Sequence, residues 1–164
     1  MTILKYDNNI LFPRRERPNH ESSREASSPL PIFITVCTRN RVPALANARA
    51  HNVLRELWSD NSRWIVGPYV IMPEHCHLIV AEASSNETPL GMWIGWWKQR
   101  SSKEVGRNSL AWQRDYWDTA IRSQEMFAEK IAYMQNNPIK RGLAQFVGQW
   151  PFLGGLHGLS WNSG

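Results

Sequence analysis

The sequence predicts an α+β domain in which helices pack on an antiparallel sheet. Short β-branched apolar runs alternate with segments whose apolar residues recur at helical spacing. A chain of 164 residues can bury one compact core but is short for two ordinary domains. We therefore expect residues 30–164 to form a single domain. Residues 1–29 are polar, contain Pro and Ser and lack periodicity, so we expect a flexible arm there.

The first half of the domain predicts strand, helix, strand, strand. Residues 30–38 (LPIFITVCT) are apolar and β-branched, which is typical of a strand. Residues 47–60 place apolar side chains at helical spacing. Residues 64–82 form two strand-like runs that break at Met72-Pro73-Glu74, because proline cannot donate to a sheet.

The second half predicts helix, strand, helix and then irregular chain. Residues 89–104 open with Pro89 after a threonine, the favoured order at a helix start. Residues 111–121 are interpreted as a strand, and residues 123–137 as a helix that Pro138 ends. The Gly-rich tail that follows is expected to be irregular. The order β-α-β-β-α-β is that of the ferredoxin-like fold, which RRM proteins share, here with an additional C-terminal helix free to approach the other face of the sheet.

The composition indicates a soluble protein with an anionic partner. The formal net charge is +5 and the sequence pI is about 9.6, which favours nucleic acid. Nine tryptophans offer both core volume and flat faces for unpaired bases. Cys37 and Cys76 lie in apolar runs and are expected to be reduced. With no apolar stretch near roughly 18 residues and no apolar signal region, we expect a cytoplasmic, nucleoid-associated protein without a membrane partner.

Two short segments carry candidate chemistry. His75 and His77 are two residues apart on a predicted strand, so their side chains share one face while Cys76 points to the other. Paired imidazoles suit half of a divalent-metal site, although the spacing taken alone is better explained by one polar histidine at a strand edge and one incidental histidine. Tyr133 and Asn137 are one helical turn apart on the last helix. Taken alone, that pair is explained by a core tyrosine and a polar helix end.

Together these segments resemble a known family. The run MPEHCHLIV, followed later by Tyr-x-x-x-Asn-Pro-x-Lys-x-Gly-Leu, resembles the Y1 transposases of the HUH superfamily. Within that superfamily, the chain is most similar to the REP-associated tyrosine transposases of bacteria. The segments WQRDYWDTAI and QWPF extend the resemblance, which spans about residues 30–152. One departure is Cys76 at the hydrophobic position between the histidines, where a buried cysteine serves as a small hydrophobe.

The resemblance implies a metal-dependent enzyme that cleaves and rejoins single-stranded DNA. In that family, residues matching His75, His77 and Asn137 bind a divalent ion, Mg²⁺ or Mn²⁺. The residue matching Tyr133 is the nucleophile, which leaves a 5′-phosphotyrosine and a free 3′-hydroxyl. The implied substrate is single-stranded DNA with a hairpin, such as a REP-like repeat. The protein is expected to be a monomer or a homodimer.

Basic side chains near these motifs are candidate DNA contacts. One group follows Trp93, Trp96 and Trp97 of the second helix, and the other lies before and after the Tyr133 helix. The members are Lys98, Arg100, Lys103, Arg107, Arg114, Lys140 and Arg141. At least two of the three tryptophans are expected in the core because they recur at helical spacing. Arg14, Arg15 and Arg17 of the arm either touch phosphate or form part of a solvated tail.

Two other functions remain open from the sequence. A non-catalytic domain of RRM-like fold that binds single-stranded DNA or RNA would share the element order, but it would leave the histidine pair unexplained. A hydrolytic metal nuclease would use activated water in place of Tyr133. Tyr116 is the rival nucleophile, and it lacks an amide ligand one helical turn away.

Overall fold

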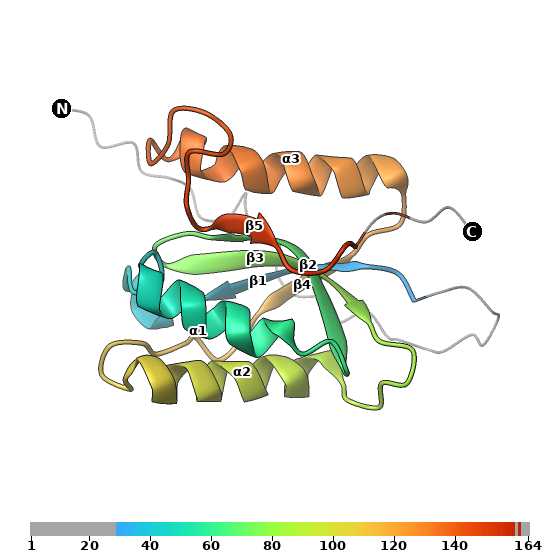
Figure 1. The fold of residues 1–164 in the computed structure, drawn as a ribbon, viewed down its shortest axis with the longest axis horizontal. Coiled ribbons are helices and arrows are strands. Elements are labelled where there is room, and N and C mark those ends of the chain that lie inside the picture. The colour runs from blue at the N-terminus through green and yellow to red at the C-terminus, as the bar shows by residue number, and fades with distance from the viewer. Residues whose placement is uncertain (1–28, 160, 162–164) are drawn as a thin grey trace.

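A computed structural model of the chain describes residues 29–159 and 161, and it shows an antiparallel sheet with helices on both faces (Figure 1). The sheet has five strands in the order β4-β1-β3-β2-β5, and each neighbouring pair is antiparallel. The strands are β1 Ile32–Cys37, β2 Trp64–Ile71, β3 His75–Glu82, β4 Trp117–Ala120 and β5 Leu153–Gly155. The helices are the 3-10 turn η1 Arg39–Arg41, α1 Ala48–Ser59, α2 Leu90–Val105 and α3 Gln124–Lys140. The predicted α+β class and antiparallel sheet are confirmed, whereas the predicted arm lies outside the described residues apart from Pro29.

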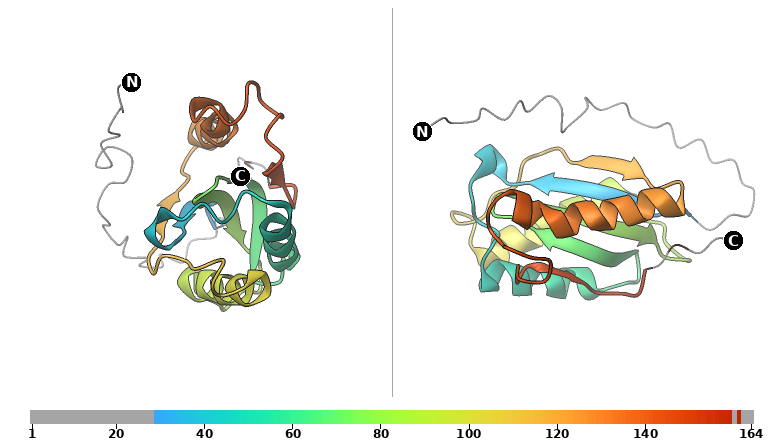
Figure 2. Two further views of the ribbon diagram at one scale, coloured as in Figure 1. Left: turned by 90° about the vertical axis from the view of Figure 1, so that its left-hand side faces the viewer. Right: turned by 90° about the horizontal axis from the view of Figure 1, so that it is seen from above.

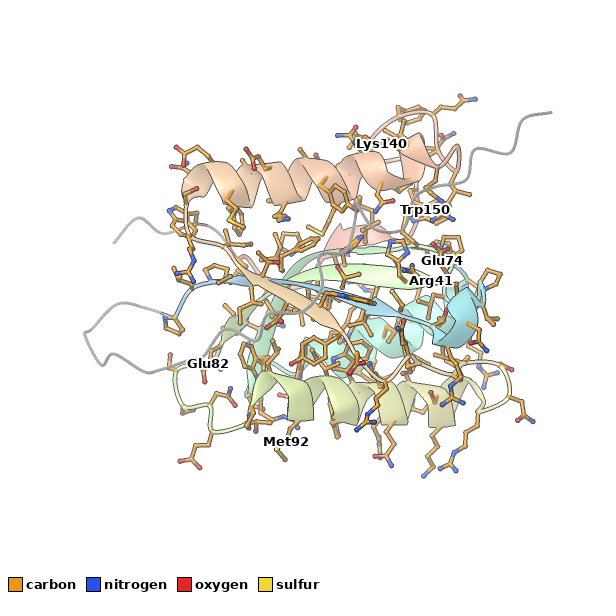
Figure 3. The ribbon with its side chains drawn as sticks, turned by 180° about the vertical axis from the view of Figure 1, so that it is seen from behind. Arg41, Glu74, Glu82, Met92, Lys140 and Trp150 are labelled. Carbon is orange, nitrogen blue, oxygen red and sulfur yellow. The ribbon has the colours of Figure 1, made fainter. Side chains whose placement is uncertain are left out.

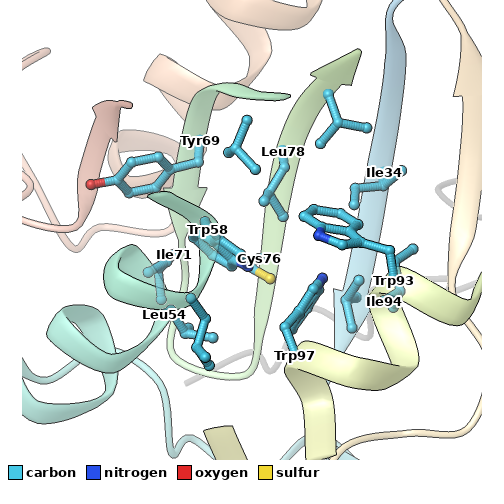
Figure 4. Close-up of a cluster of buried hydrophobic side chains, with 14 of the residues drawn as sticks. Ile34, Leu54, Trp58, Tyr69, Ile71, Cys76, Leu78, Trp93, Ile94 and Trp97 are labelled. Atoms are coloured by element: carbon cyan, nitrogen blue, oxygen red, sulfur yellow. The ribbon is translucent and has the colours of Figure 1, made fainter. Parts of the chain in front are cut away.

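α1 and α2 cover one face of the sheet, where most of the buried aromatic side chains of the described residues lie (Figures 1 and 2). Trp58, Trp93 and Trp97 are at most 1% exposed, and their rings pack edge to face around the central strands. Figure 4 shows the Cys76 thiol pointing into this cluster. Trp96 is only partly buried and lies under the Arg63 guanidinium. The expectation that at least two of the three α2 tryptophans belong to the core is therefore confirmed, and those two cannot stack on DNA bases.

α3 lies on the opposite face of the sheet, above a second and smaller core (Figure 2). Phe33, Val70 and Ile79 of the sheet meet Phe127 and Met134 of the helix there. The face pattern follows from strand alternation, since Ile34 and Val36 point to the first core while Phe33 and Thr35 point toward α3.

α3 begins where the sequence predicts and ends three residues later. Ser123 caps the start by accepting from the Met126 amide. The predicted end at Asn137 is wrong, because Pro138 lies inside the helix, which continues to Lys140. A proline near the C-terminus removes only one internal hydrogen bond. Gly142, at φ +70°, then ends the helix by donating to Ile139 O, while the Leu143 amide donates to Pro138 O, a Schellman arrangement.

Two strands differ from the prediction. β4 covers four residues rather than residues 111–121, because the preceding loop leaves the sheet after a single bridge between Thr38 and Trp112. β5 is a strand where irregular chain was expected. Its glycines let the backbone approach β2 closely: a Cβ on Gly154 would lie 2.9 Å from the Tyr69 hydroxyl. Among the described residues, no helix is both long and apolar enough to cross a bilayer.

Candidate active site

The paired histidines of β3 meet on the face that α3 covers. β3 pairs with β1 so that His77 lies opposite Thr35 and His75 opposite Cys37. Both imidazoles are buried, at 6% and 2% exposure for His75 and His77. Their Nε2 atoms are 3.1 Å apart. The predicted placement of both rings on one face, with Cys76 on the other, is what the structure shows.

The Nδ1 atom of each histidine is held by a neighbour. His75 Nδ1 lies 3.0 Å from Glu74 Oε1, and His77 Nδ1 lies 2.7 Å from Thr35 Oγ1. Burial alone would raise the pKa of Glu74, but the hydrogen bonds and charges of His75 and Arg141 outweigh it and lower that pKa to about 2. An ionised Glu74 can only accept, so His75 Nδ1 carries its hydrogen. In its neutral form, His75 then presents the lone pair of Nε2 to His77.

The tautomer of His77 decides what lies between the two Nε2 atoms. The Thr35 hydroxyl both donates and accepts, so it is compatible with either tautomer of His77. In one tautomer a His77 Nε2 hydrogen bridges the two rings, and in the other both Nε2 atoms are free to bind a cation. Burial, followed by the charges of His75 and Lys130, holds the pKa of His77 well below its usual value. The lowered pKa favours the neutral form of His77, which is the form that binds metal.

The spacing of the two Nε2 atoms fits two ligands of one ion. Nitrogens that are each ~2.1 Å from a metal lie ~3 Å apart when they are at right angles around it. In residues 29–159 and 161, no group of three or more His, Cys, Asp or Glu side chains is arranged to hold a metal. Within this part of the chain, a third protein ligand would be of another type, such as an amide.

Asn137 lies on α3 between two residues that contact the histidine site. Tyr133, Asn137 and Arg141 lie on successive turns of one helix face. Tyr133 packs on His77 with ring centroids 5.3 Å apart, and Arg141 binds Glu74 through Nη1 and Oε1 at 2.6 Å. Asn137 lies between these two contacts and is 9% exposed. Its side-chain amide makes no hydrogen bond to another described residue.

Tyr133 is held beside the histidine pair by aromatic contacts. Its ring meets Phe33 edge to face at 6.1 Å, and Phe33 in turn stacks on His77 at 5.1 Å. The side chain is half-buried, and this burial raises the pKa of the hydroxyl. The rival tyrosine, Tyr116, packs against the first core, and its hydroxyl would lie 3.2 Å from a Cβ on Gly91 of α2. The sheet therefore separates Tyr116 from the histidines.

The basic candidates divide between the two faces of the sheet. Lys140 is exposed at the end of α3 and lies at the same end of the molecule as Glu74 and Arg41 (Figure 3). Arg114 is exposed on the loop whose bridge joins the end of β1. Arg100, Lys103 and Arg107 are exposed on or after α2, on the side of the sheet away from the histidines.

Lys98 has a different environment from the other basic candidates. Its ammonium group donates to the carbonyls of Gln113, Arg114 and Asp115, at 2.8, 3.2 and 3.5 Å. Burial lowers its pKa, partly offset by the charge of Asp115 and the nearby thiols. These contacts make Lys98 a support for the loop before β4, and they leave it poorly placed for the phosphate contact predicted from the sequence.

Comparison with known proteins identifies relatives of one kind. The chain is 28% identical over 123 residues to a REP-associated tyrosine transposase of Escherichia coli, covering 73% of each chain. It is 26% identical to a Haemophilus influenzae protein described as a candidate member of the same family, of which it spans about half, 53%. The solved structure of a REP-associated tyrosine transposase bound to a REP hairpin is 26% identical, with a TM-score of 0.65 over 81% of each chain. The predicted resemblance to REP-associated tyrosine transposases is confirmed.

Other comparisons add less. The structure of a Deinococcus radiodurans protein described as a candidate transposase is 16% identical, with a TM-score of 0.50 over 71% of this chain, and supports the fold alone. No family model matches the sequence. The likeness to REP-associated tyrosine transposases therefore rests on individual relatives and on a shared fold.

The sequence analysis missed two residues of the site. Thr35 and Glu74 hold the Nδ1 atoms of the histidines but were not among the predicted site residues. A threonine inside an apolar strand and a carboxylate next to a histidine are weak signals, because both occur widely for other reasons. Only the pairing of β1 with β3 shows that Thr35 faces His77.

Proposed function

We propose that the protein is a divalent-metal-dependent transposase that cleaves and rejoins single-stranded DNA at REP-like hairpins through Tyr133. One arrangement supports the proposal: the buried imidazoles of His75 and His77 bring their Nε2 atoms together beside the Tyr133 ring. The Nδ1 atom of each imidazole is held by a neighbouring side chain. Outer-shell partners of this kind are typical of metal-binding histidines. The named relatives, one of them bound to a REP hairpin, support this substrate. We interpret the strand order β4-β1-β3-β2 as a ferredoxin-like core extended by β5.

In the proposed reaction, the Tyr133 oxygen attacks the scissile phosphorus as the bond to the 3′ oxygen breaks. The products are a 5′-phosphotyrosine and a 3′-hydroxyl, and the tyrosine proton leaves as the 3′ oxygen gains one. A divalent ion, Mg²⁺ or Mn²⁺, held by His75, His77 and Asn137 would offset charge on the non-bridging oxygens and favour the ionised tyrosine. Because burial raises the pKa of Tyr133, the hydroxyl needs such help at neutral pH.

The surface around the C-terminal end of α3 is the proposed approach for DNA. Lys140 is exposed there, and the following loop presents Phe146 and Val147 at 60% and 49% exposure. Positive charge beside an exposed aromatic ring suits a single strand, whose phosphates and unstacked bases need both. Arg114 lies on a loop beside the end of β1, the strand end that pairs with His75. We assign the α2 residues Arg100, Lys103 and Arg107 a secondary role, because the sheet lies between them and Tyr133.

The RRM-like alternative has less support from the structure. RRM domains stack bases on an open sheet face. Here α3 covers the corresponding face, and Phe33 is 7% exposed beneath it. An aromatic residue in that position cannot serve as a platform for bases.

The proposal is tested with labelled single-stranded DNA that carries a REP-like hairpin, incubated with Mn²⁺ and analysed by denaturing electrophoresis. We expect a covalent protein–DNA band that is lost in Tyr133→Phe and in His77→Ala and is retained in the control Tyr116→Phe. Cleavage that survives Tyr133→Phe without a covalent band would favour the hydrolytic nuclease. Hairpin binding without cleavage at any metal concentration would favour the non-catalytic binding domain.

A further inference from the structure

We propose that Glu74 and Arg141 are positioning residues that fasten the Tyr133 helix to the metal-ligand strand. This role rests on the proposed function and differs from the DNA contact that the sequence predicts for Arg141. Glu74 immediately precedes the first histidine, and Arg141 is the C-cap of α3. The two residues are separated by 67 positions in the sequence and meet directly in the fold.

The contact between Arg141 and Glu74 is bidentate, with two hydrogen bonds between guanidinium and carboxylate. Arg141 Nη1 lies 2.6 Å from Glu74 Oε1, and Nη2 lies 3.3 Å from Oε2. Paired guanidinium–carboxylate bonds of this kind are stronger and more directional than a single hydrogen bond. The Glu74 side chain is 13% exposed and the Arg141 side chain 41%, so the carboxylate is shielded from water while the guanidinium is partly open to it.

The same carboxylate continues the link to the metal site. Oε1 of Glu74 accepts from Arg141 and also lies 3.0 Å from His75 Nδ1. A chain of charged hydrogen bonds therefore runs from the end of α3 to an imidazole. Through this chain, the position of the helix and the orientation of His75 depend on each other.

α3 needs such a link because its other contacts with the sheet are mainly apolar. Phe127 and Met134 pack on the second core, and apolar packing is not directional. Arg141 lies two turns beyond Tyr133, or ~12 Å along the helix at ~1.5 Å per residue. Anchoring that end sets both the rotation and the axial position of the face that carries Tyr133 and Asn137.

Arg141→Met tests the proposal in the metal-free protein, with Arg122→Met as the matched control. Arg122 is an exposed arginine just before the other end of α3 and makes no ion pair with another described residue. Loss of the bidentate contact with Glu74 should let the last turns of α3 open more often. We expect amide hydrogen exchange in residues 133–140 to accelerate roughly tenfold in Arg141→Met, the change that one charge-assisted hydrogen bond produces. Arg122→Met should exchange like the wild type.

Metal binding and catalysis give independent readouts. By titration with Mn²⁺ alone, Arg141→Met should bind roughly tenfold more weakly, because His75 and Asn137 lose their alignment. At saturating DNA and Mn²⁺, the rate of covalent adduct formation should fall at least tenfold, with little change in the KM for DNA. Lys140→Met should show the opposite signature, a higher KM for DNA and a smaller salt dependence of binding.

A charge reversal separates the two halves of the link. Glu74→Arg combined with Arg141→Glu restores an ion pair between strand and helix, but arginine cannot accept from His75 Nδ1. We expect the double variant to recover protection of α3 to within about threefold of the wild type while its Mn²⁺ binding stays weak.

The proposal is overturned if Arg141→Met leaves hydrogen exchange and Mn²⁺ binding unchanged and only weakens DNA binding in a salt-dependent way. Arg141 would then be a DNA contact. Failure of the proposed function is distinguishable, because a wild-type protein that forms no adduct would still show the hydrogen-exchange effect if the link holds.

Discussion

Replacing Thr35 by valine tests the geometry of the histidine pair without touching a metal ligand. Valine has nearly the shape of threonine and suits a strand, so the change removes mainly the hydroxyl. That hydroxyl lies 2.7 Å from His77 Nδ1, and the two residues are 4% and 2% exposed. Without it, a buried ring nitrogen has no partner and His77 can change its tautomer or rotate.

The expected magnitude follows from that burial. Leaving a buried polar group without a partner costs about 1–3 kcal/mol of unfolding free energy. For a domain of this size, the melting temperature falls by roughly 2–4 °C for each kcal/mol. Loss of an outer-shell partner also weakens metal binding by about 10–100-fold. Thermal unfolding in EDTA at pH 8 and Mn²⁺ titration measure the two effects separately.

Thr35→Ser is the matched control. It keeps the hydroxyl but removes a buried methyl group, which costs roughly 1 kcal/mol. Both variants should therefore be destabilised, while only the valine variant should lose Mn²⁺ affinity. Unchanged Mn²⁺ affinity in Thr35→Val, alongside a large loss in His77→Ala, would refute the idea that the hydroxyl orients His77.

Three further predictions concern the scaffold. Lys98→Met should lower the unfolding free energy by about 1–3 kcal/mol, because the ammonium group donates to three backbone carbonyls. Arg100→Met, at an exposed position of the same helix, should change it by less than ~0.5 kcal/mol. Equal effects of the two variants in urea unfolding would contradict this. Gly142→Ala should lower the unfolding free energy by about 1–2 kcal/mol, because its φ of +70° is unfavourable for alanine even though no atom lies near the added Cβ. Gly95→Ala inside α2 should raise it by roughly 0.5–1 kcal/mol, because alanine favours a helix and the added Cβ meets no atom. Calorimetry would measure both changes. Burial and the charge of Arg55 lower the pKa of His51, so around and below about pH 6.5 the folded state binds fewer protons than the unfolded state. The free energy of unfolding should therefore decrease as the pH is lowered from about 8 to about 5.5. His51→Gln should flatten that decrease, and a profile identical to the wild type would argue against it.

Much of the fold could be predicted because its signals are local. Apolar spacing identified α1 and α2, and β-branched runs identified β1, β2 and β3. β5 could not be predicted in this way, because its glycines have no side-chain pattern and the strand exists only through its pairing with β2. The end of α3 was misplaced for a related reason: the helix runs past Pro138 to the turn at Gly142.

The basic residues show the limit of charge as a predictor. Lys98 and Arg100 are alike in the sequence, yet one supports a loop from a partly buried position and the other is exposed. Arg141 and Lys140 are adjacent, yet Arg141 alone is paired with Glu74. A positive charge in a sequence indicates a preference for anions, and the fold decides whether that anion comes from the protein itself.

The sequence by itself determined which side chains share a face. Strand alternation placed His75 and His77 together and Cys76 opposite, and helical periodicity aligned Tyr133 with Asn137, because both repeats are properties of the backbone. Tertiary structure alone decided what these side chains meet. Thr35 is 42 residues from His77 and Arg141 is 67 residues from Glu74, and such contacts form only when the sheet order and the packing of α3 bring distant segments together.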